Sequence, residues 1–426
     1  MTAPDHVDSY YVASANSAPQ HESVQGAHEC DVCVIGAGLT GCSAALELAS
    51  RGYDTVVVEA QRVGWGASGR SGGQAIFGYA CEQTKLGKLV GREDARRLWA
   101  MSVEAMALLR ERITSYRIDC DYRPGQMHAA IKPRQHRELL AWKDELEDEY
   151  HYDSLRMVQG DELASLMDTR RYVSGLLDTA SGHLHPLNLT LGLSAAARES
   201  GARFFEKSPA LEIRQGDPVR VVTPDGEIRC RYLLLCGNAY LGDLSRRIRS
   251  RVMPVGTYII ATERLDQDLA SSLIANDMAV ADVNFVLDYY RLSADRRMLF
   301  GGRVSYSTIP PPSLPNSIRA RMIKVYPQLK DVRIEYAWGG NVAITMNRAP
   351  DIGRLANNVF YAQGFSGHGI VTTGFAGKVL AEAVAGTAER LDVFARIPHH
   401  PFPGGRLLRM PALVLAMAYY RIRDLL

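Results

Sequence analysis

The chain has 426 residues, of which 46% are hydrophobic, and its formal net charge at pH 7 is +2. This length suffices for two domains with substantial cores, and the balanced charge argues against nucleic acid as a partner. The seven cysteines are scattered. Cys30 and Cys33, spaced C-x-x-C, lie before and in a predicted buried strand, which favours core thiols in a reducing cytoplasm over a metal site.

Residues 1–27 form a predicted N-terminal arm that is polar and has no signal-peptide core. The first regular unit is a strand, a glycine turn, a helix and a second strand. The apolar run Val32–Ile35 predicts a buried parallel strand, and Leu39–Ser50 is rich in helix-forming residues. The second strand, Thr55–Val58, ends on Glu59, about 20 residues past the glycines, where a dinucleotide-binding motif places the acid for a ribose hydroxyl.

The turn in this unit has the spacing G-x-G-x-x-G. Such glycines allow a tight turn, a close approach of pyrophosphate to the backbone, and close packing of helix on strand. The helix N-terminus supplies free N–H groups for the phosphates. Glu59 disfavours NADP, while FAD and NAD both stay open at this stage. The predicted contacts with a dinucleotide are Gly36, Gly38, Leu39, Thr40, Gly41, Glu59 and Ala60.

A second glycine-rich stretch, Arg62–Gln74, follows directly. Its backbone N–H groups can surround a phosphate or a ring edge, and its Trp65 and Gln74 argue against a flexible surface loop. The cofactor contacts predicted here are Gly66, Ala67, Ser68, Gly69, Arg70, Gly73 and Gln74.

The middle of the chain alternates helices with strands. The predicted helices are Arg92–Arg112, Arg134–Tyr150, Pro186–Ser200 and Asn316–Tyr326. The predicted short strands are Arg203–Glu206, Ala210–Arg214, Val219–Thr223 and Tyr232–Cys236. Three longer runs are typical of antiparallel strands: Val252–Glu263, Ala279–Leu292 and Met298–Val304.

A third glycine turn, around His368, joins the predicted buried strand Val359–Tyr361 to a predicted helix over 369–385. If the dinucleotide is a flavin, the N-terminus of this helix would stabilise the negative charge that the reduced ring carries at N1 and C2=O. His368 could add to this effect or could simply pack with both nitrogens satisfied. The residues predicted to contact the cofactor here are Gly364, Ser366, Gly367, His368, Gly369 and Ile370.

The C-terminal segment, 401–426, is predicted to be helical, and its apolar run Pro411–Tyr420 is too short to span a membrane. Basic residues flank the run. We expect this helix to dock on the body of the protein, and the alternative is a peripheral contact with a membrane surface.

Together the motifs "GWGASGRSGGQ" and "GFSGHG" and the first glycine turn resemble the D-amino-acid-oxidase superfamily of flavoproteins. "SYYVASAN", "WGGNVAITMNRAPDIGR", "YAQGFSGHG" and "PFPGG" resemble the γ-glutamylputrescine oxidases within it, and the likeness covers nearly the whole chain. The resemblance implies extended FAD beneath a substrate domain, with further cofactor contacts at Ala210 and Gly237.

The sequence departs from the sarcosine oxidases of this superfamily. Their carboxylate-binding lysine, two residues after "SGHG", is matched by Val371, which argues against an α-amino acid bound through that lysine. Their flavin-linking cysteine has no counterpart because residues 331–350 contain no Cys. We therefore expect noncovalent FAD.

The predicted fold class is α/β, with a Rossmann-like FAD-binding domain built from discontinuous segments and an antiparallel β-sheet substrate domain with helices. The FAD-binding segments are expected at 28–115, 152–247 and 340–400. The substrate domain is expected at 116–151 and 248–339.

The resemblance also implies hydride transfer from the carbon of a primary amine to flavin N5, giving aldehyde and ammonia, with molecular oxygen reduced to hydrogen peroxide. His368 and Gln74 are the candidate catalytic residues. An aromatic pocket would keep the amine neutral by desolvation, and Arg291 or Arg303 could pair with a distal carboxylate. The candidate substrate-binding residues are Trp65, Tyr258, Phe285, Tyr289, Tyr290, Arg291, Arg303 and Trp338.

Two other functions stay open. One is an amine or amino-acid dehydrogenase on the same fold that passes electrons to a quinone or carrier, and the other is a nucleotide-binding protein without turnover. The sequence does not fix the amine or the oligomeric state.

Overall fold

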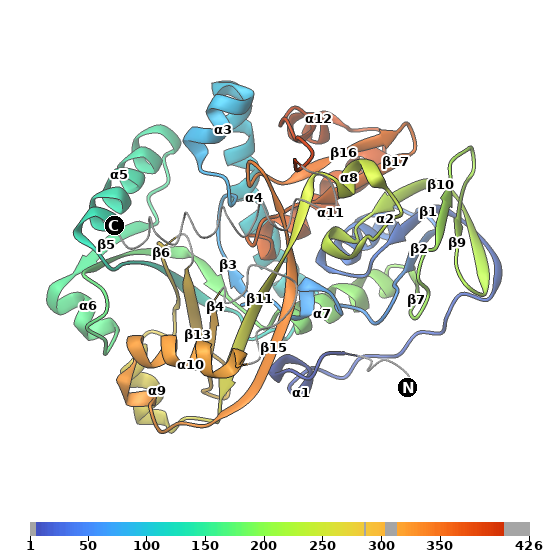
Figure 1. Ribbon diagram of the computed structural model, residues 1–426. Coiled ribbons are helices and arrows are strands. Elements are labelled where there is room, and N and C mark those ends of the chain that lie inside the picture. Colours follow the sequence, from blue (N-terminus) through green and yellow to red (C-terminus); the bar gives the residue numbers. More distant parts are fainter. Residues whose placement is uncertain (1–5, 285–286, 303–312, 404–426) are drawn as a thin grey trace.

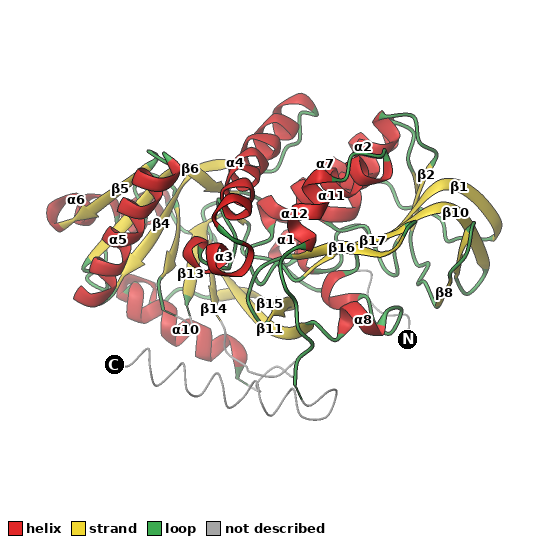
Figure 2. Ribbon diagram, turned by 90° about the horizontal axis from the view of Figure 1, so that it is seen from above, coloured by secondary structure: helices red, strands yellow, loops and turns green. Residues whose placement is uncertain are grey.

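The computed structural model describes the chain except for residues 1–5, 285–286, 303–312 and 404–426. Two β-sheets lie side by side, with helices α2, α4, α7 and α11 grouped near the middle of the molecule (Figures 1 and 2). This arrangement confirms the predicted fold class. The predicted C-terminal helical segment lies almost wholly outside the described residues. Within the part of the chain that is described, no helix is long and apolar enough to cross a bilayer.

The first sheet has eight strands among the described residues, and its main path runs β16-β17-β10-β1-β2-β7. The five strands from β17 to β7 are parallel, and β16 is antiparallel to its neighbour. Their apolar residues are buried on both faces, as parallel strands between helices require. The bounds are β1 (Gly26–Ile35), β2 (Thr55–Val58), β7 (Arg203–Phe205), β8 (Glu212–Arg214), β9 (Val219–Val222), β10 (Gly226–Leu235), β16 (Asp351–Ala356) and β17 (Val359–Gln363).

Two helices, α2 (Leu39–Ser50) and α11 (Ile370–Val384), pack against strands of this sheet, and α7 (Pro186–Glu199) packs against α2. Glycine makes the approach possible, because a Cβ at Gly41 would lie 1.9 Å from the carbonyl oxygen of Gly36. A Cβ at Gly377 would lie 2.6 Å from the carbonyl oxygen of Thr40, so α11 crosses α2 with almost no space between their backbones.

The second sheet has nine strands among the described residues, with the path β15-β11-β14-β13-β12-β4-β6-β3 and β5 paired to β6. The bounds are β3 (Gln74–Ala75), β4 (Arg123–Ala130), β5 (Leu155–Gln159), β6 (Ser174–His183), β11 (Val252–Thr262), β12 (Ala279–Asp282), β13 (Asp288–Leu292), β14 (Met298–Gly302) and β15 (Ile334–Thr345). The remaining helices are α1 (Tyr10–Ala13), α3 (Gln83–Val90), α4 (Arg92–Ser115), α5 (Pro133–Tyr150), α6 (Gly160–Leu166), α8 (Arg246–Arg249), α9 (Gln267–Leu273), α10 (Leu314–Val325) and α12 (Glu389–Ala395).

The second sheet differs from the sequence expectation in three respects. The predicted strand Ala279–Leu292 is two strands, because the Asp282 carboxylate accepts the N–H of Asn284 and ends β12 in a turn. The pair β4–β12 is parallel, so the sheet is not purely antiparallel. β5 and β6, which lie within the segment 152–247 expected in the FAD-binding domain, belong to the second sheet.

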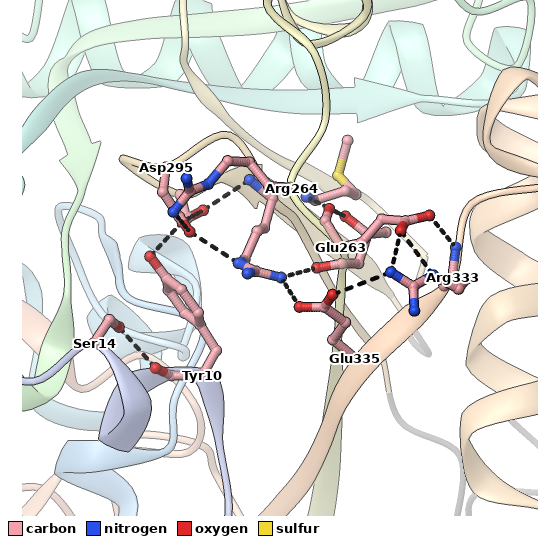
Figure 3. Close-up of polar contacts among 11 residues, drawn as sticks. Tyr10, Ser14, Glu263, Arg264, Asp295, Arg333 and Glu335 are labelled. Carbon is pink, nitrogen blue, oxygen red and sulfur yellow. Dashed lines mark hydrogen bonds and ion pairs between the residues drawn. The ribbon is translucent and has the colours of Figure 1, made fainter.

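The N-terminal arm binds to this second sheet (Figure 3). The Tyr10 hydroxyl donates to Asp295 at 2.7 Å, and burial together with this bond raises the pKa of Tyr10 to about 12. Tyr11 is fully buried, with its ring 5.2 Å from that of Trp338, centroid to centroid. The arm is therefore an integral part of the fold.

Candidate active site

A single cavity of about 940 Å³ joins the three glycine turns that the sequence analysis singled out. It runs from the start of α2, past the loop over 65–74, to the turn before α11. The second sheet contributes the opposite wall through residues that include His128, Ala281 and Tyr289. The first and third glycine turns are more than 300 positions apart in the sequence, yet they line the same cavity.

The first end of the cavity is built around Glu59. One carboxylate oxygen accepts the N–H of Ala37 at 2.8 Å, and the other accepts the N–H of Gln61 at 2.9 Å. These bonds hold the glycine turn against the end of β2, and burial raises the pKa of Glu59. The N–H of Leu39, in the first turn of α2, donates to Ser68 Oγ at 2.9 Å. The positive end of α2 thus faces the loop that completes this end of the cavity.

The other end is the turn before α11. Ser366 and Gly367 have φ of 56° and 91°, which reverses the chain from β17 into the helix. His368 Nε2–H donates to the carbonyl oxygen of Phe77 at 2.6 Å. Burial lowers the pKa of His368, so the imidazole is neutral near pH 7. The partial positive charge at this turn therefore comes from the helix backbone and not from an imidazolium.

The second sheet presents Tyr289 to the cavity. Its ring lies between two glycines, because a Cβ at Gly72 would lie 2.7 Å from the ring and one at Gly301 would lie 2.2 Å from it. Beside it, the Gln74 side-chain amide donates to the carbonyl oxygen of Val280 at 2.9 Å, which joins β3 to β12. These two side chains are held by packing and hydrogen bonding before any ligand arrives.

This cavity is lined by most of the residues that were predicted from the sequence. They are Gly36, Gly38, Leu39, Thr40, Glu59, Ala60, Trp65, Gly66, Ala67, Ser68, Gly73, Gln74, Ala210, Gly237, Tyr289, Ser366, Gly367, His368, Gly369 and Ile370.

Other predicted residues lie behind the cavity wall. Gly41 and Gly69 serve backbone packing, and the Arg70 guanidinium stacks on the Trp65 ring at 4.0 Å. Gly364 has a φ of 75° and accommodates Thr345, whose Cγ2 would be 2.4 Å from a Cβ there.

Four of the proposed substrate contacts do not line the cavity either. Arg291 is buried, and its guanidinium donates to the carbonyl oxygens of Gly72 at 2.9 Å and Leu184 at 2.8 Å. Its role is to fix the loop behind the cavity, so the suggested pairing with a distal carboxylate is not supported. Tyr258, Tyr290 and Trp338 are buried in core clusters. Phe285 and Arg303 lie outside the described residues.

The structure adds lining residues that the sequence analysis missed: Glu82, His128, Asp282, Asn284 and Arg348. The His128 ring contacts Trp142 edge to face, with centroids 5.2 Å apart, and burial lowers the pKa of His128 to about 4. Burial raises the pKa of Asp282 to about 7. Four of these residues lie in no recognised motif. Arg348 lies within the stretch "WGGNVAITMNRAPDIGR", but that pattern does not show which of its side chains faces the cavity.

The cavity fits the expected FAD. The α2 N-terminus suits its pyrophosphate, Glu59 can accept from a ribose hydroxyl, and the turn before α11 suits the flavin ring. Cys236 is the only cysteine among the described lining residues, and burial raises the pKa of its thiol to about 12, so it is not a reactive thiolate.

Comparisons with known proteins identify the family of the chain. Residues 31–383 match the family model described as FAD dependent oxidoreductase. The chain is 44% identical to γ-glutamylputrescine oxidoreductase of Escherichia coli (strain K12), covering 99% of each chain. It is 40% identical to a probable oxidoreductase, OrdL, of Haemophilus influenzae, covering 99% of this chain and 98% of the relative. The solved glycine oxidase of Geobacillus kaustophilus matches with a TM-score of 0.73 at 18% identity, over 88% of this chain and 99% of that one.

Proposed function

The chain belongs to the family of FAD-dependent oxidoreductases, and on this premise we propose that it oxidises the primary amine of γ-glutamylputrescine or a related polyamine derivative. That it is an oxidoreductase acting on an amine follows from its relatives. The choice of this amine rests on the likeness to the E. coli protein along the whole chain.

Bound FAD would supply at its N5 the acceptor for a hydride from the amine carbon, and molecular oxygen would be the final acceptor of the two electrons, giving hydrogen peroxide. Water then hydrolyses the imine, so the balance is RCH₂NH₂ + O₂ + H₂O → RCHO + NH₃ + H₂O₂. The amine must be neutral for this step, because an ammonium has no lone pair to assist hydride loss.

The residues of the chain would bind and orient. The α2 turn and Glu59 would hold the nucleotide half of FAD, and the turn at His368 would hold the ring. Ala281, Val283 and Tyr289 give the opposite wall an apolar surface, which would exclude water and favour the neutral amine. The observation that carries the proposal is that one cavity joins both cofactor turns to this wall.

The test is an anaerobic screen in which added amines bleach the yellow flavin absorbance of the purified protein. We expect γ-glutamylputrescine to bleach it faster than putrescine, and amino acids to leave it yellow. Bleaching by amino acids alone would reject the amine, and a protein that stays colourless after incubation with FAD would reject the cofactor.

The electron acceptor is tested separately. Peroxide formed in air in a one-to-one ratio to aldehyde supports an oxidase. Bleaching without peroxide, with turnover restored by a quinone, supports the dehydrogenase alternative.

Two further points belong to the proposal. We propose that FAD is noncovalent, so acid precipitation should release all of the flavin into the supernatant. We also propose the cytoplasm as the place of action, because all seven cysteines are free thiols and six of them are buried.

A further inference from the structure

The cavity wall next to the α11 turn carries an arginine. Arg348 is the only arginine or lysine among the described residues that line the cavity. It follows β15 in a tight turn, with its N–H donating to the carbonyl oxygen of Thr345 at 3.1 Å and a left-handed φ of 67°. The Thr345 hydroxyl in turn donates to the carbonyl oxygen of Ala349 at 2.7 Å. The backbone that presents this side chain is therefore fixed.

An acidic residue lines the same cavity. Glu82 immediately precedes α3, and its side chain makes no capping bond to that helix. Its carboxylate is exposed and has no hydrogen bond or ion pair among the described residues. The other acidic lining residues all have partners: Glu59, Asp243 and Asp282.

Both charges act on the same neighbour. Burial raises the pKa of the Cys81 thiol to about 11, with Lys85 and Arg348 lowering it and Glu82 raising it. Arg348 also lowers the pKa of His368. Hydrogen bonds tie both segments to the α11 turn. The N–H of Thr345, three residues before Arg348, donates to Ser366 Oγ at 3.2 Å, and His368 donates to the carbonyl oxygen of Phe77, five residues before Glu82, at 2.6 Å. Arg348 and Glu82 thus both line the cavity where it adjoins this turn.

We propose that Arg348 and Glu82 bind an amino-acid head group at the far end of the substrate. Arg348 pairs with the α-carboxylate, and Glu82 pairs with the α-ammonium, of a γ-glutamyl group. This inference rests on the proposed function and names the part of the substrate that selects it. It assigns to Arg348 the role that the sequence suggested for Arg291 or Arg303.

The chemistry of the substrate class requires such a pair. A γ-glutamyl amide carries a carboxylate and an ammonium group on the same carbon, whereas putrescine carries only positive charge. Removing such a zwitterion from water is costly unless each charge finds a partner. An arginine can meet a carboxylate with two parallel hydrogen bonds, which adds geometric selectivity to the charge pairing.

The experiment uses four amides of putrescine that differ only at the far end. The γ-glutamyl amide has both charges, the glutaryl amide only the carboxylate, the 4-aminobutanoyl amide only the ammonium, and the butanoyl amide neither. We expect Arg348→Gln to raise KM about tenfold or more for the first two amides and to leave the other two unchanged. We expect Glu82→Gln to affect the γ-glutamyl and 4-aminobutanoyl amides alone. In each case kcat should stay close to wild type.

A second measurement needs no turnover. γ-Glutamylbutylamide has the head group but no reactive amine, and calorimetry gives its Kd directly. We expect each variant to weaken this binding about tenfold or more and Arg348→Lys to weaken it less than Arg348→Gln. Lys88→Gln, on the exposed side of α3, is the matched control and should bind as wild type does. FAD content and the thermal midpoint establish that each variant is folded.

The outcomes separate the two proposals. If KM rises equally for all four amides, or for none, while the wild type oxidises the γ-glutamyl amide, the head-group inference is wrong and the proposed function stands. If the wild type oxidises none of the amides, the proposed function is wrong. An unchanged Kd for γ-glutamylbutylamide in both glutamine variants would also overturn the head-group inference.

Discussion

The contact between Gly41 and Gly36 gives the sharpest test of the nucleotide site. In Gly41→Ala the new methyl group would start 1.9 Å from the Gly36 carbonyl oxygen and 3.2 Å from Val34 Cγ1. The oxygen belongs to the backbone of the glycine turn, so α2 must move by roughly 1 Å to restore van der Waals contact. Overpacking of this kind costs about 1–3 kcal/mol. The shift also moves the first N–H groups of α2 away from the turn, so we expect FAD affinity to fall about tenfold or more.

The assay is the flavin-to-protein ratio after purification, followed by FAD titration of the apoprotein and by thermal unfolding. Gly87→Ala is the matched control, because the nearest atom to a Cβ there is the Ala95 methyl group at 4.0 Å. An alanine inside α3 should be neutral or should stabilise the protein by up to about 1 kcal/mol. If Gly41→Ala keeps the flavin content and thermal midpoint of Gly87→Ala, the reasoning about this close contact is refuted.

Three other changes have directions set by the structure. Gly301→Ala, whose Cβ would lie 2.2 Å from the Tyr289 ring, should displace that ring and raise KM for the amine about tenfold at normal FAD content; an unchanged KM would contradict this. Glu59→Gln removes an acceptor for a backbone N–H, so FAD titration should give a Kd about tenfold higher, and an unaltered Kd would count against it. Asp282 has a folded pKa of about 7, above its unfolded value of about 4. The wild type should therefore lose stability as pH rises between these values, up to about 4 kcal/mol, and Asp282→Asn should remove that loss in thermal unfolding at pH 5 to 8.

Local sequence patterns predicted those elements in which each residue type has a recognisable local structural role. The strand ending at Glu59, the glycine turn and α2 were recognisable because each residue type has a local physical reason. The helices α5, α7 and α11 were also placed to within one or two residues. β4 and β6 were missed because glycine, proline and polar residues interrupt their apolar pattern. β15 was missed as a strand because Gly339 and Gly340 interrupt its apolar alternation.

The cavity wall was harder to predict, because the face to which a strand residue points depends on pairing with distant strands. Tyr289 and Tyr290 are neighbours in β13, yet Tyr289 lines the cavity and Tyr290 stacks on Phe300 in the core. Arg291 has the charge expected of a carboxylate binder, but tertiary contacts bury it. Arg348 lies within the recognised stretch "WGGNVAITMNRAPDIGR", but only the fold shows that it lines the same cavity as His368.

The order of strands in the first sheet has a consequence for how the enzyme is made. β10 lies between β1 and β17, so the parallel sheet needs segments that are more than 300 residues apart in the sequence. Pairings so distant in sequence form slowly, and β17, Val359–Gln363, is synthesised long after β1. We therefore expect the cofactor to bind only after residue 363 has left the ribosome, and nascent chains that stop before residue 359 should carry no flavin.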